Sequence, residues 1–541
     1  MTFSPHSNFW LTGVFLLACL SSLTPVTPAL AQGNYAVTEI QTPEWPGTLH
    51  FADMNGDQRM DLIIPRWQQS TGRELLIFLQ QANGSYLQQP DRLVEIKPEI
   101  IAVALADLRP EPGAELLLFS ASAVFSLSSA IPEYSGNLKH LFDWSFVASV
   151  PERRETLFFN AVYPTESGQI ELLLPGRNGY GVFRSQGDEA FTLIHEFNTV
   201  NTDLDAGEIP VGNGGFDTNL EINERDGIVL DVIPRPATAF NEFIVEEDLI
   251  IRNNESGPRR PGRIEDDTLL LQTSHWLPMA IRAEMNGDGA ADLVYLNIGN
   301  DLQPQLNILL QQADGTYPDK PDWQGALNTR GDLNLVDLDG DGLHDLLRID
   351  GEGNSWTASL YRNQGGSFKF ATADQVMRFS GYDLELDVVD INTDGVLELS
   401  ANYYTIPIID AIRNTSITRT QLLYASAGSS ANNTLPFFSA RPDFRLDESF
   451  SADSVLGLSE PLQLQYDLNA DGRNDVLAVN SDGALTARTI TEGYRIAEPP
   501  FWQYVPSRTI TDVDVYQLNG DAIPDLVLFH STTASILVSR P

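Results

Sequence analysis

The sequence predicts an all-β fold, and three observations support this prediction. Apolar runs of strand length recur along the whole chain, separated by turns rich in Asp, Asn and Gly. Convincing helical periodicity is found in no segment. The 541 residues also include 40 Gly and 32 Pro, which is typical of a fold with many turns.

The composition narrows the classes of partner. The chain has 33 Lys and Arg against 74 Asp and Glu, a net charge of −41. Nucleic acids and anionic membranes recruit clustered basic residues, so neither is expected as a partner. Hydrophobic residues make up 42 %, enough for a folded core. Cys19 is the only cysteine, which excludes internal disulfides, zinc–thiolate sites and a cysteine nucleophile from the mature chain.

The first 31 residues are predicted to be a secretory signal peptide. Residues 9–23 form a short apolar run, and Ala29, Leu30 and Ala31 form an A-x-A cleavage site before Gln32. An alternative is a lipid anchor at Cys19, because residues 16–19 loosely resemble a lipobox. No other stretch is apolar for the roughly 20 residues of a membrane helix. We therefore expect an exported protein: extracellular, periplasmic or at the cell surface.

A repeat accounts for the remaining chain, residues 32–541. Nine-residue loops between two apolar strands start at residues 53, 107, about 160, 284, 337, 390, 467 and 517. Most steps are 50 to 54 residues, the length of one four-stranded blade of a β-propeller. Six loops are well formed, the loop at 107 is degenerate, and the one near 160 is recognised only by its strands, at 157–162 and 166–174. Eight loops favour eight blades, with seven as the alternative.

Two steps are longer and predict insertions at 199–275 and 405–430. The first insertion contains acidic, Gly-rich and Arg-rich stretches together with strand-like ones. Insertions between blades emerge at one face, where function is often found. A flexible surface loop without a function is an equal alternative.

Closure of the ring is predicted to use the N-terminal strand. Only two strands follow the last loop before Pro541, so the last blade lacks its outer strand. Residues 35–40 have the apolar alternation to supply it. We predict that they pair beside residues 533–539, since an open sheet edge invites aggregation.

The loops have the composition of calcium sites. Positions 1, 3, 5 and 9 carry carboxylate or amide groups, the oxygen ligands that Ca²⁺ takes six to eight at a time. Turn preference alone explains Asp, Asn and Gly in a loop, but it does not require an acid at position 9 of six loops. The sequence therefore predicts several calcium sites, with these candidate ligands: Asp53, Asn55, Asp57, Asp61, Glu284, Asn286, Asp288, Asp292, Asp337, Asp339, Asp341, Asp345, Asp390, Asn392, Asp394, Glu398, Asp467, Asn469, Asp471, Asp475, Asn519, Asp521 and Asp525.

The loops are expected to differ in quality. The loop at 337–345 has four Asp and should be the best, whereas the last loop starts with Gln517 and has Pro524 before its final acid. In the degenerate loop Arg109 occupies position 3. We expect its guanidinium to neutralise Asp107 and Glu111, so that no metal binds at 107–115.

These motifs resemble the FG-GAP/VCBS repeats, which are also the units of the integrin α-chain β-propeller. The resemblance rests on D-x-[DN]-x-D-G-x-x-D before an apolar strand and on a later Gly-x-Phe/Tyr, as at Gly84 to Tyr86. It covers nearly all of residues 33–541 apart from the insertions. It implies calcium binding with a backbone carbonyl ligand at position 7, here Arg59, Leu343 or Arg473. Propellers of this family usually have seven blades.

The sequence favours a secreted calcium-binding scaffold, without catalysis, for an extracellular carbohydrate or surface protein. The alternative is a secreted polysaccharide lyase or hydrolase, with its site at the axial mouth or in the 199–275 insertion. A third possibility is a structural module of a larger surface assembly. The seven histidines show no H-x-x-x-H spacing, which disfavours a zinc hydrolase.

Overall fold

A computed structural model gives the fold of the chain. It describes residues 35–540 apart from gaps at 43–48, 130–136, 147–157, 160, 166–167, 177–178, 188–189, 199–229, 233–279, 299–303, 328–331, 392–394, 406–415, 428–435, 452–462, 481 and 492–494. No α-helix occurs within this part of the chain. The predicted signal segment, residues 1–31, lies outside it, as do the ligand candidates Asn392 and Asp394.

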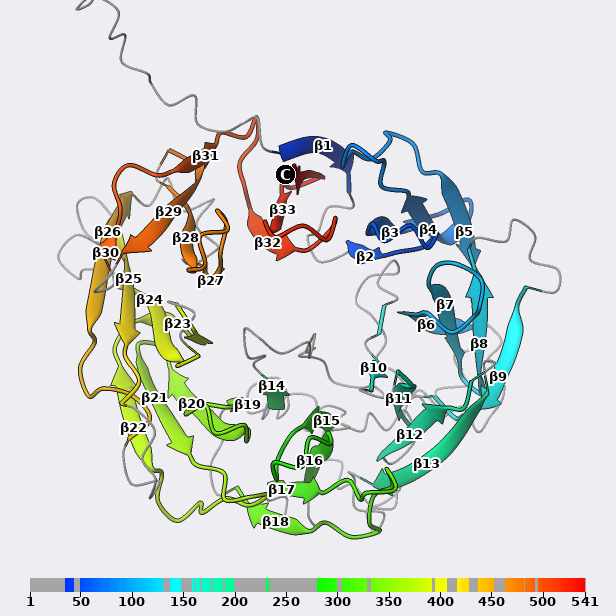
Figure 1. Cartoon of the computed structure of the whole chain (residues 1–541), viewed down its shortest axis with the longest axis horizontal. Helices are drawn as coiled ribbons and strands as arrows, with labels where there is room; N and C mark the ends of the chain where they lie inside the picture. The colour runs from blue at the N-terminus through cyan, green and yellow to red at the C-terminus, as the bar shows by residue number, and fades with distance from the viewer. Residues whose placement is uncertain are drawn as a thin grey trace, which may run out of the picture.

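Eight sheets stand in a ring, six with four antiparallel strands and two with a fifth strand, which confirms the eight-bladed propeller (Figure 1). The first strand of each blade lies nearest the centre of the ring, except in blade 8, which is described below. Blade 1 is β2 (His50–Ala52), β3 (Asp61–Gln68), β4 (Gly72–Phe78) and β5 (Arg92–Ile96). Blade 2 is β6 (Ile100–Ala106), β7 (Glu115–Ser120), β8 (Ala123–Ser128) and β9 (Lys139–Asp143). Blade 3 is β10 (Val162–Pro164), β11 (Ile170–Pro175), β12 (Gly179–Ser185) and β13 (Phe191–Asn198).

The next blades follow the same order. Blade 4 is β15 (Ala280–Ala283), β16 (Asp292–Ile298), β17 (Pro304–Leu309) and β18 (Trp323–Ala326). Blade 5 is β19 (Asp332–Val336), β20 (Asp345–Glu352), β21 (Ser355–Tyr361) and β22 (Gln375–Phe379). Blade 6 is β23 (Tyr382–Val389), β24 (Glu398–Thr405), β25 (Ser416–Tyr424) and β26 (Phe444–Ser451). Blade 7 is β27 (Gln463–Tyr466), β28 (Asp475–Val479), β29 (Leu485–Thr491), β30 (Arg495–Ile496) and β31 (Trp502–Tyr504), the last two both pairing with β29.

Blade 8 closes the ring in the predicted way. Its inner strands are β32 (Asp512–Tyr516), β33 (Asp525–Phe529) and β34 (Thr533–Ser539), and its outer strand is β1 (Tyr35–Gln41). β1 runs antiparallel to β34, with Tyr35 opposite Ser539 and Gln41 opposite Thr533. The two ends of the described chain therefore share one sheet (Figure 1).

The core lies between neighbouring blades. Second strands such as β33, with the sequence DLVLF, are buried throughout because each is covered by a blade on both faces. At the junction of blades 1 and 2, Met54, Ile63 and Val103 are fully buried in one cluster. Apolar burial between blades is the main driving force for this fold.

Three local features differ from the sequence-based expectation. The inner strand of blade 3 is Val162–Pro164, shorter and later than the expected 157–162. Ser416–Tyr424, inside the expected 405–430 insertion, is the third strand of blade 6. Within the 199–275 insertion, β14 (Leu230–Val232) pairs in parallel with β19 and adds a fifth strand to blade 5. An alternation pattern does not distinguish an extra edge strand from a loop.

Candidate metal centre

The well-formed loops each join the first strand of a blade to the second. In each described loop that begins with an acid, the position 1 carboxylate accepts backbone N–H bonds from within the loop. Asp337 accepts from Gly340 at 2.7 Å and from Gly342 at 3.0 Å. Both glycines have positive φ, 73° and 90°, which a residue with a side chain adopts at a cost. The same bonds recur from Gly56 to Asp53, from Gly287 and Gly289 to Glu284, from Gly395 to Asp390 and from Gly472 to Asp467.

The carboxylate at position 5 also accepts a backbone hydrogen bond from within its own loop. One oxygen of this carboxylate accepts the backbone N–H of position 7, as when Leu343 donates to Asp341 at 2.9 Å. Four further loops share this bond: Arg59 to Asp57, Ala290 to Asp288, Arg473 to Asp471 and Ile523 to Asp521. The loops thus curl around their own acids, which keeps the carboxyl groups on the inside of each turn.

Position 9 is a buried acid at the start of the second strand. In blade 5 one oxygen of Asp345 accepts the N–H of Leu338 at 3.1 Å, and the other accepts the N–H of Asn363 at 2.7 Å. Equivalent pairs of bonds go to Asp61, Asp292 and Asp525. The acid therefore connects its loop to the chain at the end of the third strand. This structural role explains why an acid recurs at position 9, where turn preference alone does not require one.

Burial makes these acids hard to ionise. It raises the pKa of Asp345 to about 9, helped by the nearby charges of Asp339 and Asp341. The pKa values of Asp292 and Asp475 rise to about 7 and that of Asp61 to about 6, again mainly through burial. A bound cation would offset this cost by favouring the charged form.

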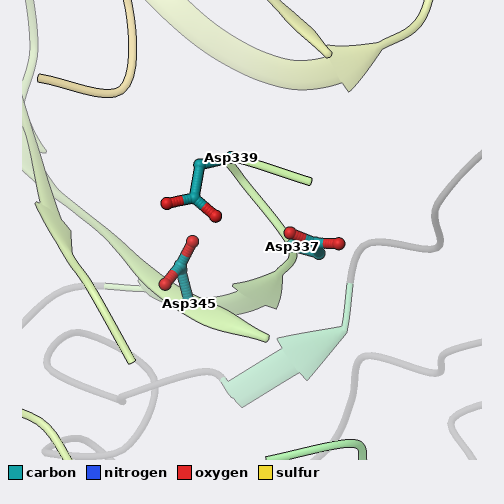
Figure 2. A group of neighbouring side chains, drawn as sticks. All are labelled: Asp337, Asp339 and Asp345. Atoms are coloured by element: carbon teal, nitrogen blue, oxygen red, sulfur yellow. The ribbon is translucent and has the colours of Figure 1, made fainter. Parts of the chain in front are cut away.

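Three carboxylates of the blade 5 loop converge on one point (Figure 2). One oxygen each from Asp337, Asp339 and Asp345 lies within 4.8 Å of the others, the one such group of His, Cys, Asp or Glu among the described residues. Two oxygens that bind the same Ca²⁺ at about 2.4 Å are at most about 5 Å apart. The spacing of these three oxygens is therefore compatible with one calcium ion, and the fourth Asp of the loop, Asp341, is not part of the group.

A cation at this site was missed by sequence reasoning. The guanidinium of Arg362, from the residue after β21, donates to Asp339 at 2.8 Å, and both side chains are buried. It also stacks 4.2 Å from the centre of the Phe437 ring. Arg362 lies 23 residues beyond Asp339 along the chain, so no loop motif includes it. A metal ion at this site would compete with the guanidinium for the Asp339 carboxylate.

At other loops an asparagine amide takes the third position. The Nδ2 of Asn469 donates to both oxygens of Asp475, at 3.2 and 3.1 Å. Asn519 donates in the same way to Asp521 at 2.9 Å. An amide nitrogen cannot bind calcium, so these side chains must turn their oxygen inward before they can serve as ligands. The last loop also uses Asp521 to accept the Ser539 hydroxyl at 2.7 Å.

The degenerate loop of blade 2 corrects one expectation. Arg109 does not reach across to the exposed Asp107 and Glu111 in the way we expected: its guanidinium is buried and donates to Ser126 at 2.6 Å and Asn137 at 2.8 Å. Its backbone N–H, like that of Leu108, goes to the position 9 acid Glu115. The direction of the Arg109 side chain is therefore set by Ser126 and Asn137, which lie outside the loop.

In blade 3 a buried acid is paired with two guanidinium groups. Glu171 is the second residue of β11, opposite Tyr163, and like the position 9 acids it precedes a buried apolar run. Its buried carboxylate pairs with Arg184 at 2.6 Å and with Arg282 of blade 4. Two guanidinium groups thus provide the positive charge here, and neither was predicted because they lie in different strands of two blades.

Neighbouring loops are joined by backbone hydrogen bonds. The N–H of position 8 donates to a carbonyl at position 1 or 2 of the preceding blade's loop. Four such bonds are present: Met60 to Leu518, Ala114 to Asp53, His344 to Glu284 and Asn474 to Ile391, at 2.8 to 3.0 Å. The loops of successive blades therefore form connected pairs at one end of the propeller.

Comparison with known families agrees with this architecture. A family model described as an FG-GAP-like repeat matches residues 337–400, which contain the loop with the converging carboxylates. The FG-GAP-like repeat thus lies in blades 5 and 6 of the eight-bladed β-propeller. No curated protein matches it. No helix in the described part of the propeller is long and apolar enough to cross a membrane.

Several solved structures are similar to this propeller at low identity. The structure of the Dos1 propeller shares 8 % identity at a TM-score of 0.39, covering 94 % of this chain and 93 % of that one. BBS1N in complex with ARL6DN shares 9 % at 0.31, covering 94 % and 96 %. A putative 6-phosphogluconolactonase from Bacteroides uniformis shares 12 % at 0.31, covering 83 % and 99 %.

Proposed function

We propose that this propeller is an exported calcium-binding scaffold that presents a binding surface to an extracellular carbohydrate or surface protein. The observation that carries the proposal is the convergence of Asp337, Asp339 and Asp345 within 4.8 Å. Asp341 and the position 7 carbonyl of Leu343 complete the oxygen ligands that the FG-GAP resemblance implies. Calcium would supply positive charge that joins the loop acids and stiffens the turn.

Export is part of the proposal and rests on the sequence. Residues 1–31 have the apolar run and A-x-A site of a signal peptide. Millimolar calcium outside the cell would keep even weak sites filled, which suits loops with asparagine at position 3. Mass spectrometry of the secreted chain tests this point: an N-terminus at Gln32 supports export by signal peptidase, and a lipid on Cys19 supports the alternative.

A role in binding is favoured over catalysis because the Arg and Tyr side chains between blades 3 and 4 are engaged in contacts within the protein. An enzyme of the lyase or hydrolase type needs Arg, Tyr or His groups free to act on a substrate. Here Arg184 and Arg282 are paired with Glu171, and Tyr317 is buried and donates to the Ala291 carbonyl at 2.9 Å. These contacts serve packing between the blades.

A glycan array tests the proposed function, with the protein applied in calcium and again in chelator. We expect retention on a defined group of glycans that depends on calcium. Binding to immobilised surface proteins under the same two conditions covers the second ligand class. Release of shortened oligosaccharides from a bound polysaccharide would instead establish the enzymatic alternative, and binding unaffected by chelation would separate the ligand site from the calcium loops.

A further inference from the structure

Blade 6 carries a second polar group, away from its loop at 390–398. It lies on the innermost strand β23 and on the two strands behind it, β24 and β25 (Figure 1). Between Tyr382 and Glu385 the pairing of β23 with β24 shifts in register, and Asp383 there has a positive φ of 56°. An irregularity of this kind redirects side chains at the edge of a strand.

Three carboxylates lie close together on this strand. Asp383 and Asp387 both act on Glu385, whose pKa rises to about 7 through burial first and through the two neighbouring charges. Burial also raises the pKa of Asp387. The nearest guanidinium in the same sheet, that of Arg419, pairs with Glu448 at 2.6 Å. Its charge is thus balanced within the blade, and the β23 acids keep a surplus of negative charge.

Two buried amides behind the acids have polar atoms without a hydrogen-bond partner. Asn402 lies opposite Glu385 in the register, and Gln421 lies opposite Asn402, so all three share one face of the sheet. Asn402 is 2 % exposed and Gln421 is 1 % exposed. Both amide atoms of Asn402, Oδ1 and Nδ2, and the Gln421 Oε1 have no partner, although Gln421 Nε2 donates to Ser400 Oγ at 2.6 Å. A buried acceptor left unpaired costs about 1 to 3 kcal/mol.

We propose that Asp383, Glu385, Asp387, Asn402 and Gln421 form a binding site for an organic cation that presents ammonium or guanidinium N–H groups. The five side chains offer oxygen acceptors across three strands, and the carboxylates supply negative charge. Charge-assisted hydrogen bonds from a cationic nitrogen match both properties. Tyr382, which is 44 % exposed at the start of β23, adds an aromatic ring on which such a cation can rest.

A metal ion fits this group less well. Among the described residues, acidic groups converge within 4.8 Å only in the loop at 337–345. The β23 acids do not meet that spacing, whereas a polyamine or a guanidinium spreads its donors over several ångströms. The proposed site goes beyond the scaffold function and does not require calcium to be bound at the loops.

Titration calorimetry of the full chain, at physiological salt and with calcium present, tests the proposal. The probes are spermidine, a blocked peptide with one arginine, and the same peptide with citrulline in place of arginine. We expect saturable binding of the cations and none of the neutral citrulline peptide. Glu385→Gln and Asp387→Asn should each weaken binding about tenfold or more, since each removes a charge-assisted bond.

A matched control is Asp514→Asn on the innermost strand of blade 8. Burial raises the pKa of Asp514 to about 6, and its carboxylate accepts the Tyr516 hydroxyl at 3.0 Å, so it is a half-buried acid of the same kind at the same place in a different blade. The affinity of the Asp514→Asn variant for the probes should match that of the unmodified protein. Tighter binding of spermidine assigns the site to free polyamines, and tighter binding of the arginine peptide assigns it to a basic side chain of a partner.

The proposal is overturned if neither cation binds, or if Glu385→Gln binds as tightly as the unmodified chain. Equal weakening by Asp514→Asn also overturns it, because it would show general attraction to an acidic protein. Calcium content measured on the same samples reports on the scaffold function separately, so the two proposals can fail independently.

Discussion

The backbone N–H of His344 donates to the carbonyl oxygen of Glu284 at 3.0 Å, which ties the loop of blade 5 to the loop of blade 4. The His344 ring nitrogen Nδ1 lies at the same distance from the same carbonyl. Because Glu284 is also the first acid of its own loop, ordering one loop should order its neighbour.

Hydrogen exchange tests this coupling. Chelation of calcium should speed exchange of the amides of His344 and Asn474, whose partners are carbonyls in the preceding loops. The amide of Leu347, which lies in the middle of β20, should keep its protection as a control. Unchanged exchange at both linking amides would show that calcium does not govern the connection.

Closure of the ring should depend on the buried face of β1. Ile40 is 4 % exposed and packs in the core of blades 8 and 1, whereas Val37 is 47 % exposed. Ile40→Ala should lower the free energy of unfolding by about 2 to 5 kcal/mol, the usual cost of a core cavity. Val37→Ala should change it by less than about 1 kcal/mol. Urea unfolding measures both, and equal effects would contradict the role of β1 in closure.

Arg362 should matter most when calcium is absent. Its guanidinium is the partner of the buried Asp339, so Arg362→Gln leaves a buried carboxylate that must be neutralised by a metal ion or by a proton. In chelator we expect a loss of about 3 kcal/mol in unfolding free energy, and a smaller loss in calcium. Calcium affinity should rise, because a competitor is gone.

Arg445→Gln is the matched control for Arg362→Gln. The pair of Arg445 with Asp447 is exposed and should contribute less than about 1 kcal/mol in either condition. Thermal melting and calcium titration of both variants give the comparison. A loss for Arg362→Gln that is equal with and without calcium would contradict competition at Asp339.

The pH dependence should have opposite signs with and without calcium. The folded pKa of Asp345 is about 9, above the unfolded value of 3.8, so its protonated form stabilises the metal-free fold. This contribution is fully present below about pH 4 and is lost as the pH rises through 9. In chelator the melting temperature should therefore fall as the pH rises from 6 to 9.

Calcium reverses the trend, because the ion binds the ionised carboxylate and a proton competes with it. The increase in melting temperature on adding calcium should be larger at pH 9 than at pH 6. Asp345→Asn should remove most of this difference. A calcium effect that is independent of pH would mean that Asp345 is not a ligand.

The parts of the structure that follow from local pattern could be predicted. The alternation of residues 35–40 was sufficient to place β1 beside β34, and the acid at position 9 marked the start of the second strand in every blade except blade 3. The partners of Arg362, Arg109 and Glu171 could not be predicted in this way. Each contact joins residues from separate strands, and its direction is set by packing that no nine-residue motif contains.

Calcium content is the measurement that tests the central claim most directly. The purified protein, equilibrated with calcium and assayed by elemental mass spectrometry, should hold several ions per chain. Asp341→Ala should hold one fewer, because Asp341 is exposed and its loss leaves the fold intact while removing a ligand from the loop at 337–345. Glu111→Ala, at the same position of the degenerate loop, should leave the count unchanged.

Thermal melting checks the same claim. Calcium at 100 times the dissociation constant of a site adds about 2.7 kcal/mol to the free energy of unfolding, so chelation should clearly lower the melting temperature. Equal melting temperatures in calcium and chelator, or a calcium count that falls for Glu111→Ala and not for Asp341→Ala, would contradict the account.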